Sequence, residues 1–333
     1  MSVSDIINTG LSEKNINPKD YLFTDIKPTD ETDCMFINGK KVGSLGNIVT
    51  ITGKPKSRKT TFLQAFIASF ISGQIIFNCE CIRPENTNIC LIDTEQSSAD
   101  LYNGVQRIKK DSNVKKLPAY FKVYQNRPLQ SFENRKFLET LILSDPKLKI
   151  VFIDGMLDFV SDMNNIDEAS TLLFLLQRLC FENNILIICI LHENKSSNFT
   201  LGHIGSFLER KSQSLLRVEK TEIGSTLSSV YMRSDEDFYP VSIFYNYNTS
   251  SYKINPNHVR DNIKTAGGLT LEELKKLSIV LYNEVNYFSN TELLSALKIH
   301  FKAQSEYFRK KVIERLYTEN LIVKIEDKIY LTH

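Results

Sequence analysis

Short runs of apolar residues recur through the middle of the chain, each bounded by polar or glycine positions. The runs predict five strands, which are Ile48–Thr52, Asn88–Asp93, Phe121–Tyr124, Lys149–Asp154 and Ile185–Leu191. Segments of helical character lie between them, notably an apolar helix that ends near Phe70 and a helix over Ala169–Asn183. Strands without polar alternation are buried on both faces, so the pattern predicts an α/β core with a parallel central sheet and helices on both faces.

The pattern changes on either side of this core. Before it, residues 1–46 form a leader in which Asn38-Gly39 predicts a hairpin turn between short strands. After Gly205, we expect further strands, added antiparallel at the sheet edge, over Leu215–Val218, Leu227–Met232 and Val241–Tyr245.

A second, smaller domain is predicted at the end of the chain. Thr270 with Glu273, and Ser289 with Glu292, fit the capping box that begins a helix, and Ser305–Tyr317 is amphipathic. Residues 322–331 alternate as a two-stranded hairpin. Three helices followed by a hairpin resemble a winged helix-turn-helix domain. The predicted divisions are a leader over 1–46, the α/β domain over 47–255, a linker over 256–268 and the small domain over 269–333.

Composition excludes few classes of function. The 333 residues are 42% hydrophobic and 24% charged, with a net charge of +2, so any contact with nucleic acid must come from local patches. The apolar segments Phe62–Ile71 and Ile185–Leu191 are too short or too interrupted to span a bilayer, and the first residues lack the features of a signal peptide. With six cysteines expected to be reduced, a cytoplasmic protein without membrane contact is predicted.

The strongest chemical signal is a phosphate loop between the first strand and the first helix. Backbone N–H groups at a helix N-terminus cradle phosphates, Lys59 reaches the β- and γ-phosphates, and Thr60 binds Mg²⁺. Arg58 stands where glycine is usual, so we expect either a tighter loop or a side chain that points outward. The predicted ligand is ATP with Mg²⁺, and the binding residues are Gly53, Lys54, Pro55, Lys56, Ser57, Arg58, Lys59, Thr60 and Thr61.

Two acids and a histidine at strand ends complete the candidate site. Asp154 ends an apolar strand nearly a hundred residues after the loop, where an acid that holds Mg²⁺ is expected in phosphate-loop enzymes. Glu95 follows the second strand and is favoured as the general base; the alternative makes Asp93 and Glu95 ordinary surface acids at a strand end. His192 ends the strand that we expect beside the strand of Asp154.

These residues together resemble the RecA/DnaB superfamily of ATPases, particularly its RepA-like branch from plasmid replication and mobile-element proteins. The similar segments are Gly46–Thr61, Asp93–Ser97, Leu191–Lys195 and Gly202–Ser206, within about residues 35–250. The resemblance implies a RecA-like fold with Lys59, Glu95 and Asp154 in hydrolysis. It also implies that His192 senses the γ-phosphate.

The resemblance further implies a homo-oligomeric ring, usually a hexamer, with a basic finger reaching the nucleotide of the neighbouring subunit. Arg233 matches the place of the finger, while Tyr231 stands where DnaB-like proteins carry an assisting lysine. The alternative is a surface arginine paired with Asp235 or Glu236.

Contacts with DNA are implied at two places. In the ring channel, the loop after His192 would touch single-stranded DNA through Lys195 and His203, with Lys211 beyond the loop; the alternative is a solvated surface loop. The loop after Asp154 carries acids that repel phosphate, which are Asp158, Asp162, Asp167 and Glu168. In the small domain, duplex DNA is a candidate ligand of Arg309, Lys310, Lys311, Arg315, Lys324 and Lys328.

The leading interpretation is a DNA-dependent ATPase in replication or mobilisation of a mobile element, acting as a helicase or as a helicase-like accessory protein. The alternative is a nucleotide-gated DNA-binding regulator or adaptor with little hydrolysis, in which the winged helix carries the function.

Overall fold

The computed structural model describes residues 17–22, 33–193, 202–221, 224–247, 249–255, 269–283, 285–301 and 306–332. The chain divides into two units, residues 1–31 and 32–333. Of the first unit, the structure describes one turn of 3-10 helix, η1 (Pro18–Tyr21), in which the backbone N–H of Lys19 donates to the side chain of Asn17. The predicted linker over 256–268 lies outside the described residues.

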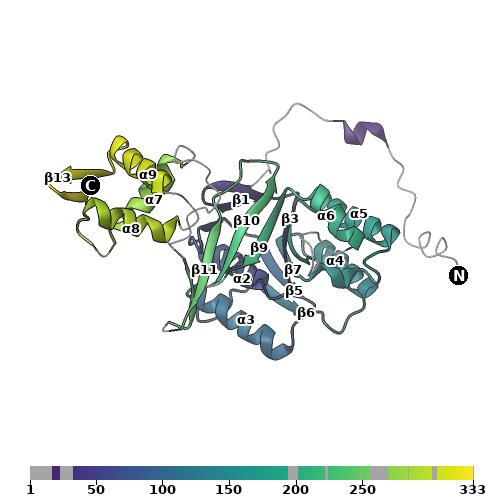
Figure 1. The fold of residues 1–333 in the computed structure, drawn as a ribbon. Coiled ribbons are helices and arrows are strands. Elements are labelled where there is room, and N and C mark those ends of the chain that lie inside the picture. Colours follow the sequence, from purple (N-terminus) through teal and green to yellow (C-terminus); the bar gives the residue numbers. More distant parts are fainter. Residues whose placement is uncertain are drawn as a thin grey trace. The chain divides into compact units, whose positions relative to one another are not determined.

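A large mixed sheet forms the centre of the second unit (Figure 1). Its described strands are, in chain order, β3 (Ile48–Gly53), β5 (Asn88–Asp93), β6 (Phe121–Gln125), β7 (Leu148–Asp154), β8 (Leu186–His192), β9 (Ser214–Lys220), β10 (Gly224–Met232), β11 (Val241–Asn246) and β12 (Ser251–Ile254). Across the sheet they follow the order β12-β11-β10-β9-β3-β8-β7-β5-β6. All five strands expected from the apolar runs are confirmed, and four of them are buried, whereas β6 lies at the edge of the sheet and buries only Phe121.

The strands from β9 to β6 are parallel, and β10, β11 and β12 continue the sheet in antiparallel pairs. The prediction that Leu215–Val218 adds antiparallel at the edge was therefore wrong, because β9 pairs parallel with β3. The cause is a helix that the sequence pattern did not reveal, α6 (Gly202–Lys211), which carries the chain back across the sheet after β8. A crossover of this kind returns the next strand in parallel.

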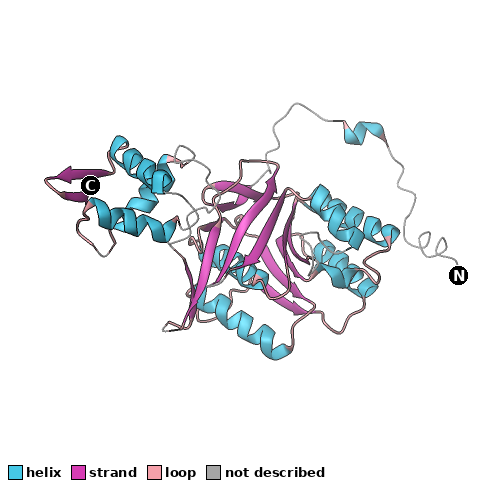
Figure 2. Ribbon diagram, viewed as in Figure 1, coloured by secondary structure: helices cyan, strands magenta, loops and turns pink. Residues whose placement is uncertain are grey.

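Helices cover both faces of the sheet (Figure 2), as the apolar strands predict. Besides α6, they are α2 (Lys59–Ser72), α3 (Ser98–Asp111), α4 (Ser131–Ser144) and α5 (Ile166–Asn183), and a 3-10 turn, η2 (Met156–Phe159), follows β7. In β3, Val49 and Ile51 join the core with α2 and α3, while Ile48 joins the core with α4, α5 and α6. Alternate side chains of one strand thus build two hydrophobic cores.

The expected hairpin at Asn38-Gly39 is confirmed and is part of the same packed unit. Its strands, β1 (Asp33–Ile37) and β2 (Lys40–Ser44), form a small sheet with β4 (Cys79–Cys81). Asn38 and Gly39 both have positive φ, the conformation that an Asn-Gly turn supplies. The cysteines of β1 and β4 are fully buried in the core that covers α2, and all six cysteines are free.

The end of the chain folds as three helices and a hairpin around a third core. The elements are α7 (Leu271–Leu281), α8 (Asn290–His300), α9 (Glu306–Thr318), β13 (Ile322–Ile325) and β14 (Lys328–Leu331). Both expected capping boxes are present, at Thr270 for α7 and at Ser289 for α8. Leu274, Leu293 and Val312 are fully buried in this core, one from each helix.

No helix within the described ranges combines the length and the apolar character that crossing a bilayer requires.

Candidate nucleotide-binding site

Four neighbouring strands bring their carboxyl ends together at one edge of the sheet. Gly53 at the end of β3 lies opposite His192 of β8, and Asp93 at the end of β5 lies opposite Asp154 of β7. Since β7 pairs directly with β8, the expectation that His192 lies beside the strand of Asp154 is confirmed. This edge of an open α/β sheet is where ligands bind.

The loop from Gly53 to the start of α2 is closed tightly on itself. Gly53 has a φ of 152°, and a β-carbon there would lie 2.3 Å from the carbonyl oxygen of Val218 and 2.9 Å from the Ser57 hydroxyl. The Ser57 hydroxyl is buried and has no hydrogen-bond partner in the described structure. A buried hydroxyl without a partner is costly, and a phosphate oxygen would satisfy it. The loop therefore fits a phosphate group.

Arg58 occupies the last position before the helix with a φ of 73°. For a residue with a β-carbon, this left-handed conformation costs about 1 kcal/mol relative to glycine. The guanidinium group leaves the loop and donates to the Gly224 carbonyl oxygen at 2.8 Å and to the Ser225 hydroxyl at 3.1 Å. Of the two alternatives expected for Arg58, the side chain that points outward is the one observed.

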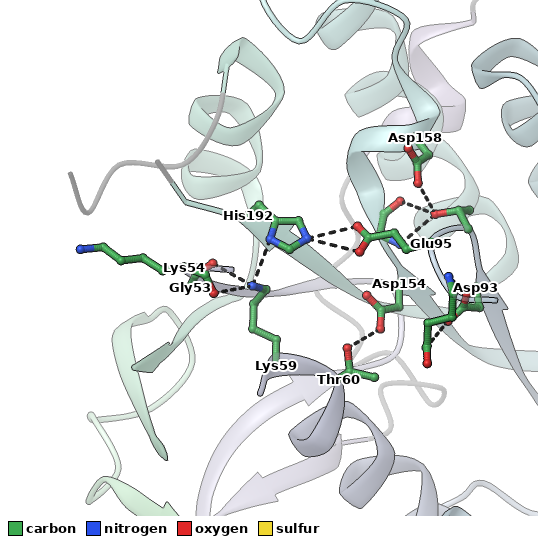
Figure 3. A network of polar contacts seen from close by, with 12 residues as sticks. Gly53, Lys54, Lys59, Thr60, Asp93, Glu95, Asp154, Asp158 and His192 are labelled. Atoms are coloured by element: carbon green, nitrogen blue, oxygen red, sulfur yellow. Dashed lines mark hydrogen bonds and ion pairs between the residues drawn. The ribbon is translucent and has the colours of Figure 1, made fainter. Parts of the chain in front are cut away.

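Lys59 lies at the centre of the polar network in Figure 3. Its ammonium group is buried and donates to the carbonyl oxygens of Gly53 at 2.8 Å and Lys54 at 3.1 Å. The third contact is to Nδ1 of His192, at 3.2 Å. Burial lowers the pKa of Lys59 to about 8. The three acceptors use all three protons of the ammonium group, and a triphosphate in the loop would compete with them.

Thr60 and Asp154 form the part of the site that suits a divalent cation. The Thr60 hydroxyl donates to Oδ2 of Asp154 at 2.7 Å. Asp154 is 3% exposed, and burial raises its pKa to about 7, because removing a carboxylate from water penalises the charged form. A hydroxyl and a carboxylate are hard oxygen ligands of the kind Mg²⁺ takes beside substrate phosphates.

Glu95 contacts His192 from the opposite side of the imidazole ring. Nε2 of His192 lies 3.1 Å from Oε1 of Glu95, while Nδ1 of the same ring faces Lys59. Because the lysine donates to Nδ1, we assign the ring proton to Nε2, from which it is donated to the carboxylate. The hydrogen bond from His192 holds the pKa of Glu95 below its ordinary value. Glu95 is thus an ionised base in the free protein.

Two buried acids near the site were not assigned a role from the sequence. Asp93 is fully buried and accepts from the backbone N–H of Gln96 at 2.8 Å, so it shapes the turn that carries Glu95. Glu193 is 2% exposed and accepts from Nε of Arg217 at 2.8 Å and from the Thr52 hydroxyl at 3.3 Å. The sequence signal for the second acid was an arginine inside the apolar run of β9, which needs a buried partner.

Thr94 links the turn of Glu95 to the segment after Asp154. Its hydroxyl donates to Oδ2 of Asp158 at 2.6 Å and accepts from the Gly155 backbone N–H at 3.0 Å. A β-carbon on Gly155 would lie 2.3 Å from Oε1 of Glu95, so a larger residue here would displace the carboxylate. Asp158 is exposed but accepts the hydrogen bond from Thr94, so it is not a free charge of the loop.

The segment after Asp158 also repels phosphate less than its acidic residues suggest. Glu168 accepts from Nη1 of Arg135 at 2.7 Å and from the Ser161 hydroxyl at 2.7 Å. Burial opposes its charge, but the hydrogen bonds from Ser161 and Arg135 lower the pKa of Glu168 to about 2. Asp162 and Asp167 are exposed.

Two of the predicted DNA-contact residues after His192, His203 and Lys211, lie on a helix. Lys195 lies outside the described residues. His203 and Lys211 are exposed at opposite ends of α6, which packs on α5 through Ile204 and Leu208. The expectation that His203 belongs to a loop was wrong, because glycines at 202 and 205 concealed the apolar face of a helix.

Arg233 is exposed and follows β10 directly, so it lies at the edge of the sheet opposite the phosphate loop. Its backbone N–H donates to the Gln213 carbonyl oxygen at 3.0 Å, and its guanidinium donates to the Arg210 carbonyl oxygen. The alternative pairing with Asp235 or Glu236 is not what the structure contains, since both acids contact Lys40. Arg233 is thus remote from the phosphate loop of its own chain.

The basic residues of the small domain have partners within it. Lys310 pairs with Glu306 at 2.8 Å and Lys311 with Glu314 at 2.5 Å, both along α9. Arg309 donates to the Phe301 carbonyl oxygen, and Arg315 contacts Glu319 at 3.2 Å. In the hairpin, Lys324 lies 4.0 Å from Asp327, and Lys328 lies over the ring of Tyr287. The exposed pairs are weak enough to be exchanged for phosphates.

Binding of ATP with Mg²⁺ is expected to release protons at about pH 6.5 and to take them up at about pH 8.5. With a pKa of about 7, Asp154 carries a proton in most free molecules at the lower pH, and a cation displaces it. With a pKa of about 8, Lys59 is mostly neutral at the higher pH, and a triphosphate restores its charge. Calorimetric titrations in buffers of different ionisation enthalpy measure the sign, and the same sign at both pH values would contradict the assignment.

Similarity to known proteins was found only among solved structures. No family model and no curated protein match the chain. Among solved structures, it is similar to the crystal structure of the RadB recombinase, with a TM-score of 0.42 and 16% sequence identity over 61% of this chain and 88% of that chain. A second similar structure is that of an ATPase domain, with a TM-score of 0.44 and 10% identity over 62% of this chain and 84% of that chain. Both scores are low, so chemistry is assigned from the side chains of this chain alone.

Proposed function

We propose that this protein is a Mg²⁺-dependent ATPase of the RecA/DnaB type that acts on DNA as a ring. The observation that carries the proposal is the convergence of Lys59, the Thr60–Asp154 pair and the His192–Glu95 pair at the ends of adjacent parallel strands. Each group has the chemical character that its role in phosphoryl transfer requires.

The proposed roles follow from contacts in the free protein. Lys59 and the loop N–H groups hold the phosphates, and the buried Ser57 hydroxyl supplies a further donor. Thr60 and Asp154 hold Mg²⁺, which neutralises the charge that develops on the phosphate oxygens. Glu95 is ionised and removes a proton from the attacking water.

His192 is proposed to couple binding of the γ-phosphate to the position of Glu95. In the free protein, the imidazole joins the Lys59 ammonium to the Glu95 carboxylate. When Lys59 turns to a γ-phosphate, Nδ1 of the ring loses its donor, and the ring is free to reorient. Glu95 is then released from His192 to face water, so hydrolysis starts only with a triphosphate in place.

DNA binding and ring assembly are proposed because the sequence motifs resemble those of the RecA/DnaB superfamily. His203 at the start of α6 and Lys195 are the channel candidates, and the small domain is proposed to be a winged helix. We also propose the domain division at 47–255 and 269–333. Paired acids on α9 favour a modest affinity of this domain for duplex DNA, since each cation must first leave its partner.

The test of the function is ATP turnover by the full chain with and without single-stranded DNA. The proposal predicts turnover that DNA stimulates and that high salt suppresses, because the contacts are mainly to phosphates. Nucleotide binding with negligible turnover in the presence of DNA would contradict it and would favour the nucleotide-gated regulator instead.

Arg233→Ala is expected to lower turnover about 10²-fold while nucleotide affinity stays close to that of the wild type, because the finger acts on transition-state charge in a neighbouring subunit. Lys136→Ala, which removes an exposed cation from α4, is the control and should have no effect. Mixing Arg233→Ala with inactive Lys59→Met subunits should restore part of the turnover, since the second variant still supplies its arginine. A mixture without any gain would remove Arg233 from the neighbouring site.

A further inference from the structure

Arg58 connects the phosphate loop to a part of the sheet that the proposed mechanism does not use. Its backbone forms the left-handed turn directly before Lys59, and its carbonyl oxygen accepts from Thr61 at the start of α2. Its side chain reaches the opposite way, to the first two residues of β10, Gly224 and Ser225. One residue thus belongs to the loop by its backbone and to β10 by its side chain.

The contacts of Arg58 extend to β12. The guanidinium carbon lies 5.8 Å from the ring centroid of Tyr252, and the guanidinium carbon of Arg107 lies 5.6 Å from the same centroid. Both distances are within the range in which a cation is attracted to an aromatic ring. Arg107 comes from α3 and also donates to the Gln64 side chain, so it contacts Tyr252 without touching the loop.

The acceptor of Arg58 is a fixed point of the sheet. Gly224 lies opposite Phe244 in the antiparallel pair of β10 with β11. A β-carbon on Gly224 would lie 1.8 Å from the carbonyl oxygen of Ile243, which shows how closely the two strands pack there. A displacement of the Arg58 side chain would therefore be transmitted to the strand. From this point β10 runs to Met232, one residue before Arg233.

We propose that Arg58 is a positioning residue that ties the phosphate loop to the start of β10, so that nucleotide in the loop alters the stability of β10. The inference rests on the proposed function only in requiring that a nucleotide binds the loop. A glycine at this position would give the loop freedom, whereas the anchored arginine fixes the left-handed turn in advance. Because coupling between two sites is reciprocal, loss of the contact between Arg58 and β10 should have two effects. It should weaken nucleotide binding, and it should abolish the change in β10 stability that nucleotide causes.

The experiment is amide hydrogen exchange of the full-length protein with and without Mg²⁺ and a non-hydrolysable ATP analogue. In the wild type, the analogue is expected to slow exchange of the β10 amides about 10-fold, within the usual range for coupled sites. Arg58→Ala and Arg58→Gly should still bind the analogue, with affinity about 10-fold weaker, and β10 should no longer respond. Arg58→Lys should restore part of the response, since an ammonium group still reaches one acceptor.

The variants distinguish loss of the contact between Arg58 and β10 from a general loss of structure. Glycine adopts the left-handed turn without strain, so Arg58→Gly keeps the loop folded if Arg58→Ala does not. Arg107→Ala is the matched control: it removes the other cation from Tyr252 but should leave the β10 response and turnover unchanged. A full β10 response in Arg58→Gly, or a wild-type protein that binds the analogue without any change in β10, would overturn the inference. Failure of the wild type to bind the analogue would overturn the proposed function instead.

Discussion

Replacing Glu95 by glutamine is expected to lower ATP turnover about 10³-fold while nucleotide affinity remains close to that of the wild type. The substitution keeps the size of the side chain, and its amide oxygen can still accept from Nε2 of His192. It removes the base, because an amide cannot take a proton from water. The loss should therefore appear at saturating nucleotide, in kcat and not in KM.

The measurement is steady-state turnover together with equilibrium binding of a non-hydrolysable analogue. Glu80→Gln is a matched control, since Glu80 is an exposed glutamate of β4 away from the strand ends of the site. Turnover of Glu95→Gln within a few-fold of the wild type would show that another group removes the proton. Asp93 could not replace it readily, because it is buried and already accepts from Gln96.

Lys59→Met is expected to lower turnover about 10³-fold and to remove most of the nucleotide affinity. Methionine fills the same space but offers no charge or donor to the phosphates. The free variant should be at least as stable to heat as the wild type, because burial of the ammonium group disfavours its charge, as the lowered pKa indicates. Loss of function without loss of stability would separate a binding role of Lys59 from a structural one.

Thermal unfolding and titration with ATP and Mg²⁺ test this pair of effects. Lys54→Ala is the appropriate comparison, because the Lys54 side chain points away from the network (Figure 3) while its carbonyl oxygen contacts Lys59. Its effect should be no more than a few-fold. Equal losses in both variants would mean that the loop acts through its general positive charge, without a specific contact from Lys59.

The sequence predicts the parts of this fold that depend on local pattern. The apolar runs of β3, β5, β7 and β8 are bounded by polar or glycine positions, so the positions of these strands could be predicted almost to the residue. The loop that follows β3 is marked by its own chemistry, and the capping boxes at Thr270 and Ser289 mark two helix starts. In each case, a few neighbouring residues contain the whole signal.

Features that depend on tertiary packing were not predicted. The direction of β9 follows from α6, whose apolar face is short: Ile204 and Leu208 are buried and Phe207 is partly buried. The strand β4 has three residues and is defined by its pairing with β1 across more than forty positions. Likewise, the pairing of Glu193 with Arg217 arises because β3 lies between β8 and β9, an order that neither residue reveals.

The sequence predicts which residues form the site, but it does not predict the hydrogen bonds that join them. Lys59, Asp154, Glu95 and His192 were expected together, and the structure brings them to one edge. That His192 joins Lys59 to Glu95 depends on the register that sets Gly53 opposite His192. The role of Arg58 was open, because its partners on β10 lie more than 160 residues further along the chain.

All of the proposed roles require that a triphosphate binds at the loop that begins at Gly53. A calorimetric titration of the folded full-length protein with ATP and Mg²⁺ tests this directly. We expect saturable binding of one nucleotide per chain by the wild type, and little or no nucleotide binding by Lys59→Met. A folded wild-type protein that binds no nucleotide, or a variant that binds as well as the wild type, would contradict it.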